Sequence, residues 1–272
     1  MDFAINHITA PNLSWLDFLN LAASVGAVGV EFRNDLASPL FSDSSTEEVA
    51  LALSKAGIKC LGLSQIYPFN SYSNATSLAI KHLVKTAKAC GAQSIPLIPR
   101  NDGTCNGARE RQINLRLALR EIKPILEEAK IIGLVEPLGF ESSSLRTKEE
   151  ALNGIEGVGG AKVFKIVHDT FHHHLAQETC FFAEHTGIVH ISGVVDKTLT
   201  INEMKDPHRV MVDKKDRLGN VEQIRFLLDF GYKGPISMEC FSPEIHGSLF
   251  IADMLQSSFK FLKEKLIWIY RV

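Results

Sequence analysis

The sequence predicts an α/β chain folded as one eight-stranded (β/α)8 barrel, and three observations lead to this prediction. Eight short apolar runs of the kind that form buried parallel strands recur along the 272 residues. Each run is followed by a helix-compatible stretch, and five returns to an apolar run pass through a glycine, which suits the left-handed residue after a helix. About 250 residues is typical for such a barrel. We therefore expect residues 1–272 to form a single domain.

The expected strands differ in length but share a central apolar run. They are residues 3–9 (FAINHIT), 28–33 (VGVEFR), 60–66 (CLGLSQI), 94–100 (SIPLIPR), 131–137 (IIGLVEP), 163–169 (VFKIVHD), 188–194 (IVHISGV) and 235–241 (PISMECF). The glycines expected to end the helices are Gly26, Gly57, Gly91, Gly187 and Gly231. A doubly wound open sheet is the alternative fold. It is disfavoured because no G-x-G-x-x-G follows the first strand and no G-x-x-x-x-G-K-[ST] occurs.

Composition and charge narrow the partners that we expect. The formal net charge is −2 with no run of Lys or Arg, so the sequence does not predict nucleic-acid binding. The N-terminus MDFAINHIT does not resemble a targeting peptide, and no apolar run reaches the roughly 18 residues of a membrane span. Five scattered cysteines without C-x-x-C spacing are typical of reduced thiols. We expect a cytoplasmic protein without a membrane partner, in which the apolar run 266–270 (LIWIY) packs on the barrel or contributes to a homodimer.

Four strands in the second half of the chain end in possible metal ligands: Glu136, Asp169, His190 and Glu239. The carboxyl ends of barrel strands open on one face, so these side chains should converge. Three carboxylates and one imidazole suit one divalent ion, Mn²⁺, Mg²⁺, Co²⁺ or Zn²⁺. Each residue also has a structural alternative, such as an ion pair, a helix N-cap for Asp169 or a core histidine. Four buried strands ending this way favour a shared cation, because an unpaired buried charge is costly.

The histidines near Asp169 are expected to have different roles. His172 should lie beside the metal site or contact a substrate hydroxyl, whereas His173 should face solvent and His174 is undecided. His168 should point to the opposite side of its strand and be structural.

Two residues near the ends of the first two strands are further candidates. His7 is a candidate substrate-binding residue, and Glu31 could contact substrate or support the metal site. Packing of His7 and an ion pair between Glu31 and Arg33 are the structural alternatives.

Several segments resemble a known family, the xylose-isomerase-like TIM-barrel sugar isomerases and epimerases. The resemblance extends over nearly the whole chain and is strongest in HDTFHHH (168–174), VHIS (189–192), DPHRV (206–210) and MECFSPE (238–244), with VEP (135–137) upstream. Within the family the sequence most resembles the inosose (2-keto-myo-inositol) isomerases of inositol catabolism. The resemblance implies metal binding by the four strand-end residues and places His172 and Arg209 near the substrate.

The expected reaction moves a carbonyl group to the adjacent carbon of inosose or a related ketose through an enediolate. The divalent ion would act as a Lewis acid, while Glu136 and Glu239 would remove and return the proton. Arg209 would anchor Glu239 or a substrate oxygen, and His172 would donate a hydrogen bond to a developing alkoxide. The partner would be a small sugar or cyclitol.

Other functions are compatible with the same barrel. A ketose 3-epimerase, a hydroxypyruvate-type isomerase and a dehydratase remain open, as does a catalytically silent sugar-binding barrel. An abasic-site endonuclease is disfavoured because the third and fourth strands contain no histidine. Two departures from the family affect the substrate: Ser192 and Gly193 follow His190 where relatives have an acidic residue, and MVDKKDRLGN (211–220) has no Pro-Gly turn. Both lie in the long loop 192–219, which should shape the pocket.

Overall fold

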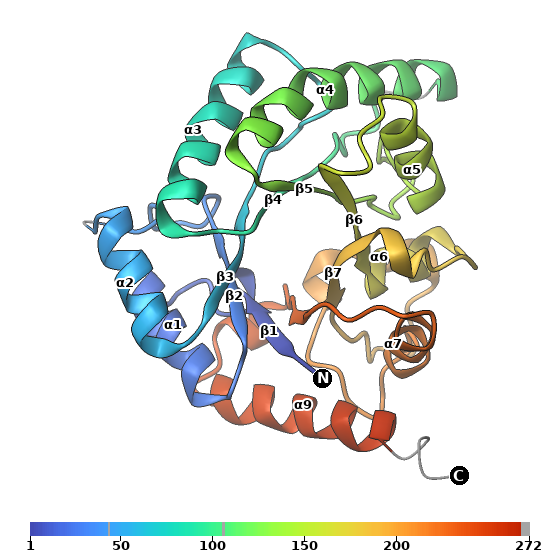
Figure 1. Ribbon diagram of the computed structural model, residues 1–272. Coiled ribbons are helices and arrows are strands. Elements are labelled where there is room, and N and C mark those ends of the chain that lie inside the picture. Colours follow the sequence, from blue (N-terminus) through green and yellow to red (C-terminus); the bar gives the residue numbers. More distant parts are fainter. Residues whose placement is uncertain (43, 105–106, 268–272) are drawn as a thin grey trace.

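A computed structural model describes residues 1–42, 44–104 and 107–267. Its eight parallel strands follow the order β3-β2-β1-β8-β7-β6-β5-β4, with the helices in a ring around them (Figure 1). The strands are β1 Phe3–Asn6, β2 Gly29–Arg33, β3 Lys59–Ser64, β4 Ser94–Leu97, β5 Ile132–Val135, β6 Phe164–Asp169, β7 Thr186–Ile191 and β8 Ile236–Met238. Every expected strand is present, most of them shorter than the apolar run that predicted them.

The sheet closes between its two ends, β3 and β4. Ile66 forms an isolated parallel bridge with Leu97 just beyond β3. The Ile66 N–H donates to the Pro96 carbonyl at 3.1 Å, and the Ile98 N–H donates back to the Ile66 carbonyl at 3.0 Å. Closure confirms the (β/α)8 barrel and rules out the open doubly wound sheet.

The helices follow the strands along the chain. They are α1 Trp15–Ser24, α2 Thr46–Ala56, α3 Asn74–Cys90, α4 Ala108–Ala129, α5 Lys148–Glu156, α6 Thr170–Ala176, α7 Asn220–Asp229, α8 Pro243–His246 and α9 Ile251–Ile267. Capping boxes begin α2 and α5. The Ser45 and Thr147 hydroxyls each accept a hydrogen bond from the backbone N–H of the glutamate three residues later, and the side chain of that glutamate accepts from the backbone N–H of the capping residue.

Four of the five expected glycines have a positive φ after a helix. Gly57 and Gly91 are the left-handed caps of α2 and α3, and Gly26 and Gly231 follow α1 and α7. The prediction for Gly187 was wrong, because this residue lies inside β7 beside a register shift against β6. A Cβ at this position would overlap the Leu134 side chain, so close packing inside the barrel explains the glycine.

The barrel interior has an apolar layer beneath a polar one. Ala4, Leu61, Leu134, Val167 and Ile188 form a small buried cluster. Strand side chains alternate between faces, so residues two positions further on point into the same interior, closer to the carboxyl ends of the strands. For four of the five strands these residues are polar and buried: Asn6, Glu136, Asp169 and His190. The apolar layer is therefore the floor of a polar site.

The long loop between β7 and α7 folds back on itself. Gly193 and Val210 form an antiparallel bridge, and short 3-10 helices span Ile201–Glu203 and Asp206–His208. Arg217 donates to the backbone carbonyls of Asp196 and Leu199. These contacts place Arg209 and the segment around it over the carboxyl ends of the strands.

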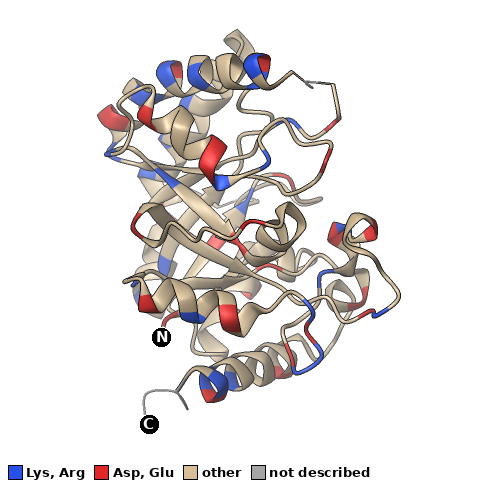
Figure 2. Cartoon of the chain, turned by 90° about the vertical axis from the view of Figure 1, so that its right-hand side faces the viewer, with Lys and Arg blue, Asp and Glu red and all other residues tan. Residues whose placement is uncertain are grey.

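The remaining expectations concern the surface and the C-terminus. Basic and acidic residues are interspersed along the outer helices in the view of Figure 2. No helix in the described ranges is both long and apolar enough to cross a bilayer. The thiols of Cys60, Cys90, Cys180 and Cys240 are free, and Cys105 lies outside the described residues. Of the run 266–270, Leu266 is buried in the main core, and residues 268–270 lie outside the described part.

Candidate metal centre

The four strand-end residues lie in one buried cluster. One ligand atom from each of Glu136, Asp169, His190 and Glu239 lies within 4.8 Å of the others. Glu136 and Glu239 directly follow β5 and β8. Asp169 is the last residue of β6, and His190 is the last but one of β7. The barrel thus brings together side chains that are up to about a hundred positions apart in the sequence.

The His190 ring is held from behind by a carboxylate. Its Nε2–H donates to Oε2 of Glu31 at 3.1 Å, since a carboxylate can only accept. The other ring nitrogen, Nδ1, lies 3.6 Å from Glu136 Oε1 and 3.4 Å from Glu239 Oε2 and has no hydrogen-bond partner among the described residues. A carboxylate that fixes the tautomer and leaves the opposite nitrogen facing a group of oxygens is the usual arrangement behind a metal-bound histidine.

Glu31 has a role that the sequence left open. Its side chain is fully buried, and Oε1 accepts a hydrogen bond from Ser237 Oγ at 2.6 Å. The structural alternative for Glu31, an ion pair with Arg33, is not observed. Arg33 instead forms a two-pronged pair with Asp35, at 2.8 and 2.6 Å, and places Nη1 3.4 Å from Glu239 Oε1. Arg33 lies one step of the pleat nearer the barrel mouth than Glu31, where Asp35 is within reach.

Arg209 joins two of the four clustered side chains. Its Nη2 donates to Asp169 Oδ2 at 2.6 Å and to Glu239 Oε2 at 2.9 Å. The guanidinium carbon lies 5.0 Å and 4.6 Å from the ring centres of Phe171 and Phe241. Burial alone would lower the pKa of Arg209, but the adjacent carboxylates of Asp169 and Glu239 raise it. Arg209 therefore stays charged and anchors Glu239, as the sequence predicted.

Asp169 combines a structural contact with its place in the cluster. Its Oδ1 accepts from the backbone N–H groups of Phe171 and His172, at 2.7 and 3.1 Å, and so caps the N-terminus of α6. Its Oδ2 faces Arg209. Asp169 therefore caps α6 through one carboxylate oxygen and keeps the other in the cluster, so the N-cap and a place in the cluster are compatible.

The charges in the cluster shift the pKa values of its members in opposite directions. Burial, with the neighbouring Glu239 and Asp169 carboxylates, raises the pKa of Glu136 against the effect of His190. For Glu239, burial would also raise the pKa, but His190, Arg209 and Arg33 hold it well below its usual range. Burial would lower the pKa of His190, whereas Glu31 and Glu239 raise it well above the ordinary value.

A cavity of about 250 Å³ opens above the cluster. Its wall includes Glu136 and Glu239, together with Arg209 and His172. Aromatic rings supply much of the remainder: Tyr67, Phe140 and Phe241. The Nδ1 atom of His172 is buried without a hydrogen-bond partner among the described residues, and its ring stands edge-on to Phe140 at 5.1 Å. His172 thus lies beside the site, and its contact with a substrate hydroxyl stays a prediction.

His7 lies next to this cavity but is not among the residues that line it. It lines a neighbouring cavity of about 340 Å³, which shares Arg33 with the first. Its ring stacks on Phe18 at 4.1 Å, and Nε2 lies 3.1 Å from the Leu13 carbonyl oxygen. Burial lowers the pKa of His7 to about 4. These contacts agree with the packing alternative, and a substrate contact by His7 stays a prediction.

Two other histidines pack outside the barrel. His168 is structural as expected, with Nε2 2.9 Å from Gln223 Oε1. The expectation that His173 faces solvent was wrong: it is buried, and its Nδ1 lies 2.6 Å from the Lys148 ammonium. No pattern in the sequence indicated that Lys148, in the first turn of α5, packs against His173 of α6.

Asn6 was missed in the sequence although it belongs to the site. Its Nδ2 donates to Glu239 Oε1 at 3.0 Å, while its Oδ1 accepts from the Ile8 N–H and begins the 3-10 helix His7–Thr9. That helix also ends β1 three residues earlier than expected. The available signal was alternation: Asn6 follows inward-facing Ala4 by two residues.

The donor set fits a divalent cation. Carboxylate oxygens and one imidazole nitrogen are ligands that Mg²⁺, Mn²⁺, Co²⁺ and Zn²⁺ accept. The Nδ1 atom of His190 is buried without a hydrogen-bond partner among the described residues, and such an ion would give it one.

Comparisons with known proteins agree with this fold. A family model described as the xylose isomerase-like TIM barrel matches residues 19–265. No curated protein matches the chain. A xylose isomerase domain-containing protein from Salmonella typhimurium has 30% identity and a TM-score of 0.88, with 97% of each chain covered.

Two more distant structures are similar in fold. A crystal structure of IolI protein with a bound zinc atom has 21% identity and a TM-score of 0.87, with 100% of both chains covered. D-psicose 3-epimerase with D-tagatose, from Clostridium cellulolyticum H10, has 16% identity and a TM-score of 0.74, covering 98% of this chain and 99% of that one.

Proposed function

The chain belongs to the xylose isomerase-like TIM barrel family, and from this premise we propose that it is a divalent-metal-dependent isomerase of small polyhydroxy ketones. The reaction would move a carbonyl group to the adjacent carbon of inosose or a related ketose. The observation that carries the proposal is the convergence of four ligand atoms, with His190 Nδ1 unpartnered, at the floor of a cavity of about 250 Å³. The zinc in the IolI neighbour gives independent support for a metal in this fold.

Glu136, Asp169, His190 and Glu239 would hold the ion. When bound, a divalent cation supplies Lewis-acid stabilisation to neighbouring carbonyl and hydroxyl oxygens of the substrate. Glu31 would keep Nδ1 of His190 directed at the ion, and Arg209 would keep Asp169 and Glu239 close together.

Two carboxylates of the cluster are placed for proton transfer as well. Glu136 and Glu239 come from strands β5 and β8 and both line the cavity. Asn6 and Arg209 donate to different oxygens of Glu239 and so fix the plane of its carboxylate. One glutamate would remove the C–H proton from the hydroxyl-bearing carbon beside the carbonyl, and the pair would deliver a proton to the former carbonyl carbon. The hydroxyl proton would pass to the former carbonyl oxygen, which completes the shift. His172 would donate a hydrogen bond to a substrate hydroxyl.

A ketose 3-epimerase is the second candidate, and the D-psicose 3-epimerase neighbour favours it. It begins with the same proton removal, but a proton then returns to the same carbon from the opposite face instead of to the former carbonyl carbon. Glutamates on two separate strands could serve either outcome, so the product of the reaction distinguishes them.

Solvent exchange tests both candidates. The protein, loaded with Mn²⁺, is incubated in D₂O with a panel of keto-inositols and ketoses, and the substrates are analysed by NMR after the ion is chelated. We expect deuterium beside the carbonyl of at least one substrate, dependent on the metal and lost in Glu239→Gln. Glu149→Gln, on the exposed face of α5, is the matched control and should exchange normally. If no candidate exchanges while Mn²⁺ is shown to be bound, the proposed function is wrong.

A further inference from the structure

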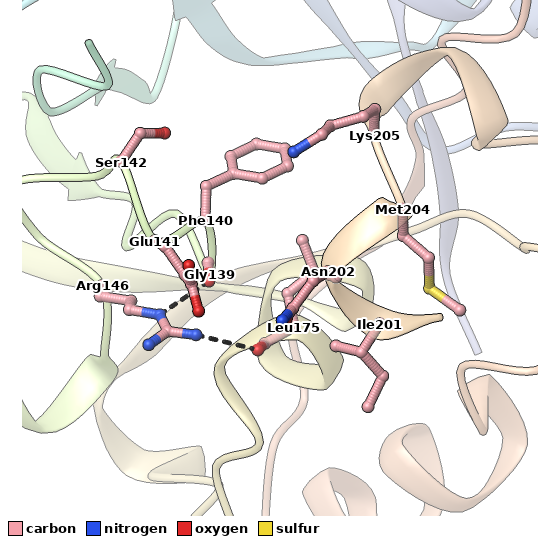
Figure 3. Close-up of a pocket in the computed structure, with 10 residues that line it drawn as sticks. All are labelled: Gly139, Phe140, Glu141, Ser142, Arg146, Leu175, Ile201, Asn202, Met204 and Lys205. Atoms are coloured by element: carbon pink, nitrogen blue, oxygen red, sulfur yellow. Dashed lines mark hydrogen bonds between the residues drawn. The ribbon is translucent and has the colours of Figure 1, made fainter. Parts of the chain in front are cut away.

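A second cavity, of about 210 Å³, lies beside the candidate metal centre (Figure 3). Residues 139–142, from the loop between β5 and α5, form one wall, and residues 201–205 of the β7–α7 loop contribute Ile201, Asn202, Met204 and Lys205 to the other. Leu175 of α6 and Arg146 complete the lining. None of these residues has a role in the proposed reaction.

The two cavities adjoin across one aromatic ring. Phe140 lines both of them. Two pairs of consecutive residues are also divided between the cavities. Leu138 and Asp206 line the metal-site cavity, and their sequence neighbours Gly139 and Lys205 line the second cavity. A ligand bound above the metal cluster could therefore extend past Phe140 into the second cavity.

Two cations face the second cavity without a carboxylate partner in the described part of the chain. Lys205 places Nζ 5.6 Å from the centre of the Phe140 ring. Arg146 is held by its Nε, which donates to the Gly139 carbonyl at 2.9 Å, and more weakly by Nη2, which lies 3.4 Å from the Leu175 carbonyl oxygen (Figure 3). The remaining guanidinium N–H groups are free to bind a ligand. Glu141 is the only carboxylate in the lining, and its side chain is exposed.

We propose that the second cavity binds an anionic group, a phosphoryl or carboxylate group, at the far end of a substrate whose carbonyl end lies at the metal cluster. The inference rests on the proposed function and narrows its substrate class to acidic polyhydroxy ketones. An anion there would accept charge-assisted hydrogen bonds from Lys205 and Arg146. The His172 ring lies 5.1 Å from the Phe140 ring, and Lys205 Nζ lies 5.6 Å from the centre of that ring, so both groups border the aromatic side chain that the two cavities share.

Lys205 is the residue to change, because Arg146 also ties its loop to α6 and could act through folding alone. The exchange assay is run with D-xylulose and D-xylulose 5-phosphate on the wild type, Lys205→Gln, Glu141→Gln and Lys197→Gln. Lys197 is exposed on the same loop and does not line the cavity, so it is the matched control.

We expect the phosphate ester to have the lower KM. Lys205→Gln should raise that KM about tenfold, as for loss of one hydrogen bond to a charged group, while leaving the KM of the uncharged ketose unchanged. Glu141→Gln removes the nearby negative charge and should lower the KM of the ester. Lys197→Gln should change neither. Equal effects of Lys205→Gln on both substrates would overturn the proposal.

A binding experiment separates this inference from the proposed function. Inorganic phosphate is titrated into the metal-loaded wild type and Lys205→Gln by calorimetry. If neither ketose exchanges, the proposed reaction fails, but a phosphate Kd about tenfold weaker in Lys205→Gln still supports the anion site. Phosphate that does not bind, or binds both proteins equally, refutes it.

Discussion

Replacing Glu31 by Gln should weaken metal binding without removing a metal ligand. Glu31 Oε2 lies 3.1 Å from His190 Nε2, on the side of the ring opposite the cluster, and the residue is fully buried. The amide has nearly the shape of the carboxylate and can still accept a hydrogen bond, but it lacks the charge that makes the imidazole a stronger ligand.

The expected magnitude follows from this single contact. Loss of a carboxylate behind a metal-bound histidine typically lowers metal affinity about 10- to 100-fold. This range corresponds to about 1.4–2.7 kcal/mol, comparable with the net worth of one hydrogen bond to a charged group. Because Ser237 Oγ contacts only Oε1 of Glu31, at 2.6 Å, Ser237→Ala should have a smaller effect in the same direction.

Competition with a chelator of known Zn²⁺ affinity measures the change directly. At saturating zinc, the stabilisation that the metal gives against unfolding should also fall by about 1.4–2.7 kcal/mol in Glu31→Gln. Far-UV circular dichroism and a cooperative unfolding transition would show that the variant is folded. Zinc affinity equal to that of the wild type in a folded Glu31→Gln protein would refute the reasoning.

Three further predictions address catalysis, pH dependence and packing. Glu239→Gln should keep the fold, by circular dichroism, and lower turnover by orders of magnitude; near-normal turnover would reject its role in proton transfer. Burial, and then Lys148, lower the pKa of His173 to about 3 against about 6.5 in the unfolded chain. Below pH 6.5 the unfolded state takes up a proton that the native state does not, so stability falls as pH falls. Measured by urea unfolding, the free energy of unfolding should fall between pH 6.5 and 4.5 by about 2–3 kcal/mol more in the wild type than in His173→Phe. An equal fall in both proteins would contradict this prediction. Gly139→Ala would drive a methyl group into the His172 carbonyl oxygen at the start of α6, so we expect a loss of about 1–3 kcal/mol in unfolding free energy; an unchanged value would show that the loop can shift freely.

The barrel was predictable because a strand covered by helices on one side and by the barrel interior on the other is apolar on both faces. Such runs can be recognised one by one in the sequence. Their ends were less certain: β1 stops at Asn6 because the side chain of that residue bonds to the Ile8 N–H and begins a 3-10 helix. Gly187 failed as a predicted helix cap because a strand packed against the Leu134 side chain also requires a residue without a Cβ.

The four clustered side chains were found because each interrupts an apolar run at its end. The groups that support them were harder to recognise. Asn6, Glu31 and Ser237 are polar residues on strands. Sequence alone does not show that Asn6 bonds to Glu239, Glu31 to His190 and Ser237 to Glu31. Their contacts depend on the strand order of the sheet, in which β1 lies between β2 and β8. The hydrogen bonds that support the clustered side chains therefore depend on tertiary structure and cannot be recognised from a local sequence pattern.

The buried charges around the cluster explain why a divalent ion suits it. Four carboxylates, those of Glu31, Glu136, Asp169 and Glu239, are buried with two guanidinium groups, Arg33 and Arg209. With all six ionised and His190 neutral, as metal ligation requires, two negative charges remain, and buried charge without compensation is costly. A divalent cation neutralises this remainder, whereas a site without the arginines would retain two further negative charges. Because Arg209 bonds to both Asp169 and Glu239, it offsets charge and fixes ligand spacing at once. The arginines therefore allow four carboxylates to share the polar layer of the barrel, one behind His190 and three in the candidate metal centre.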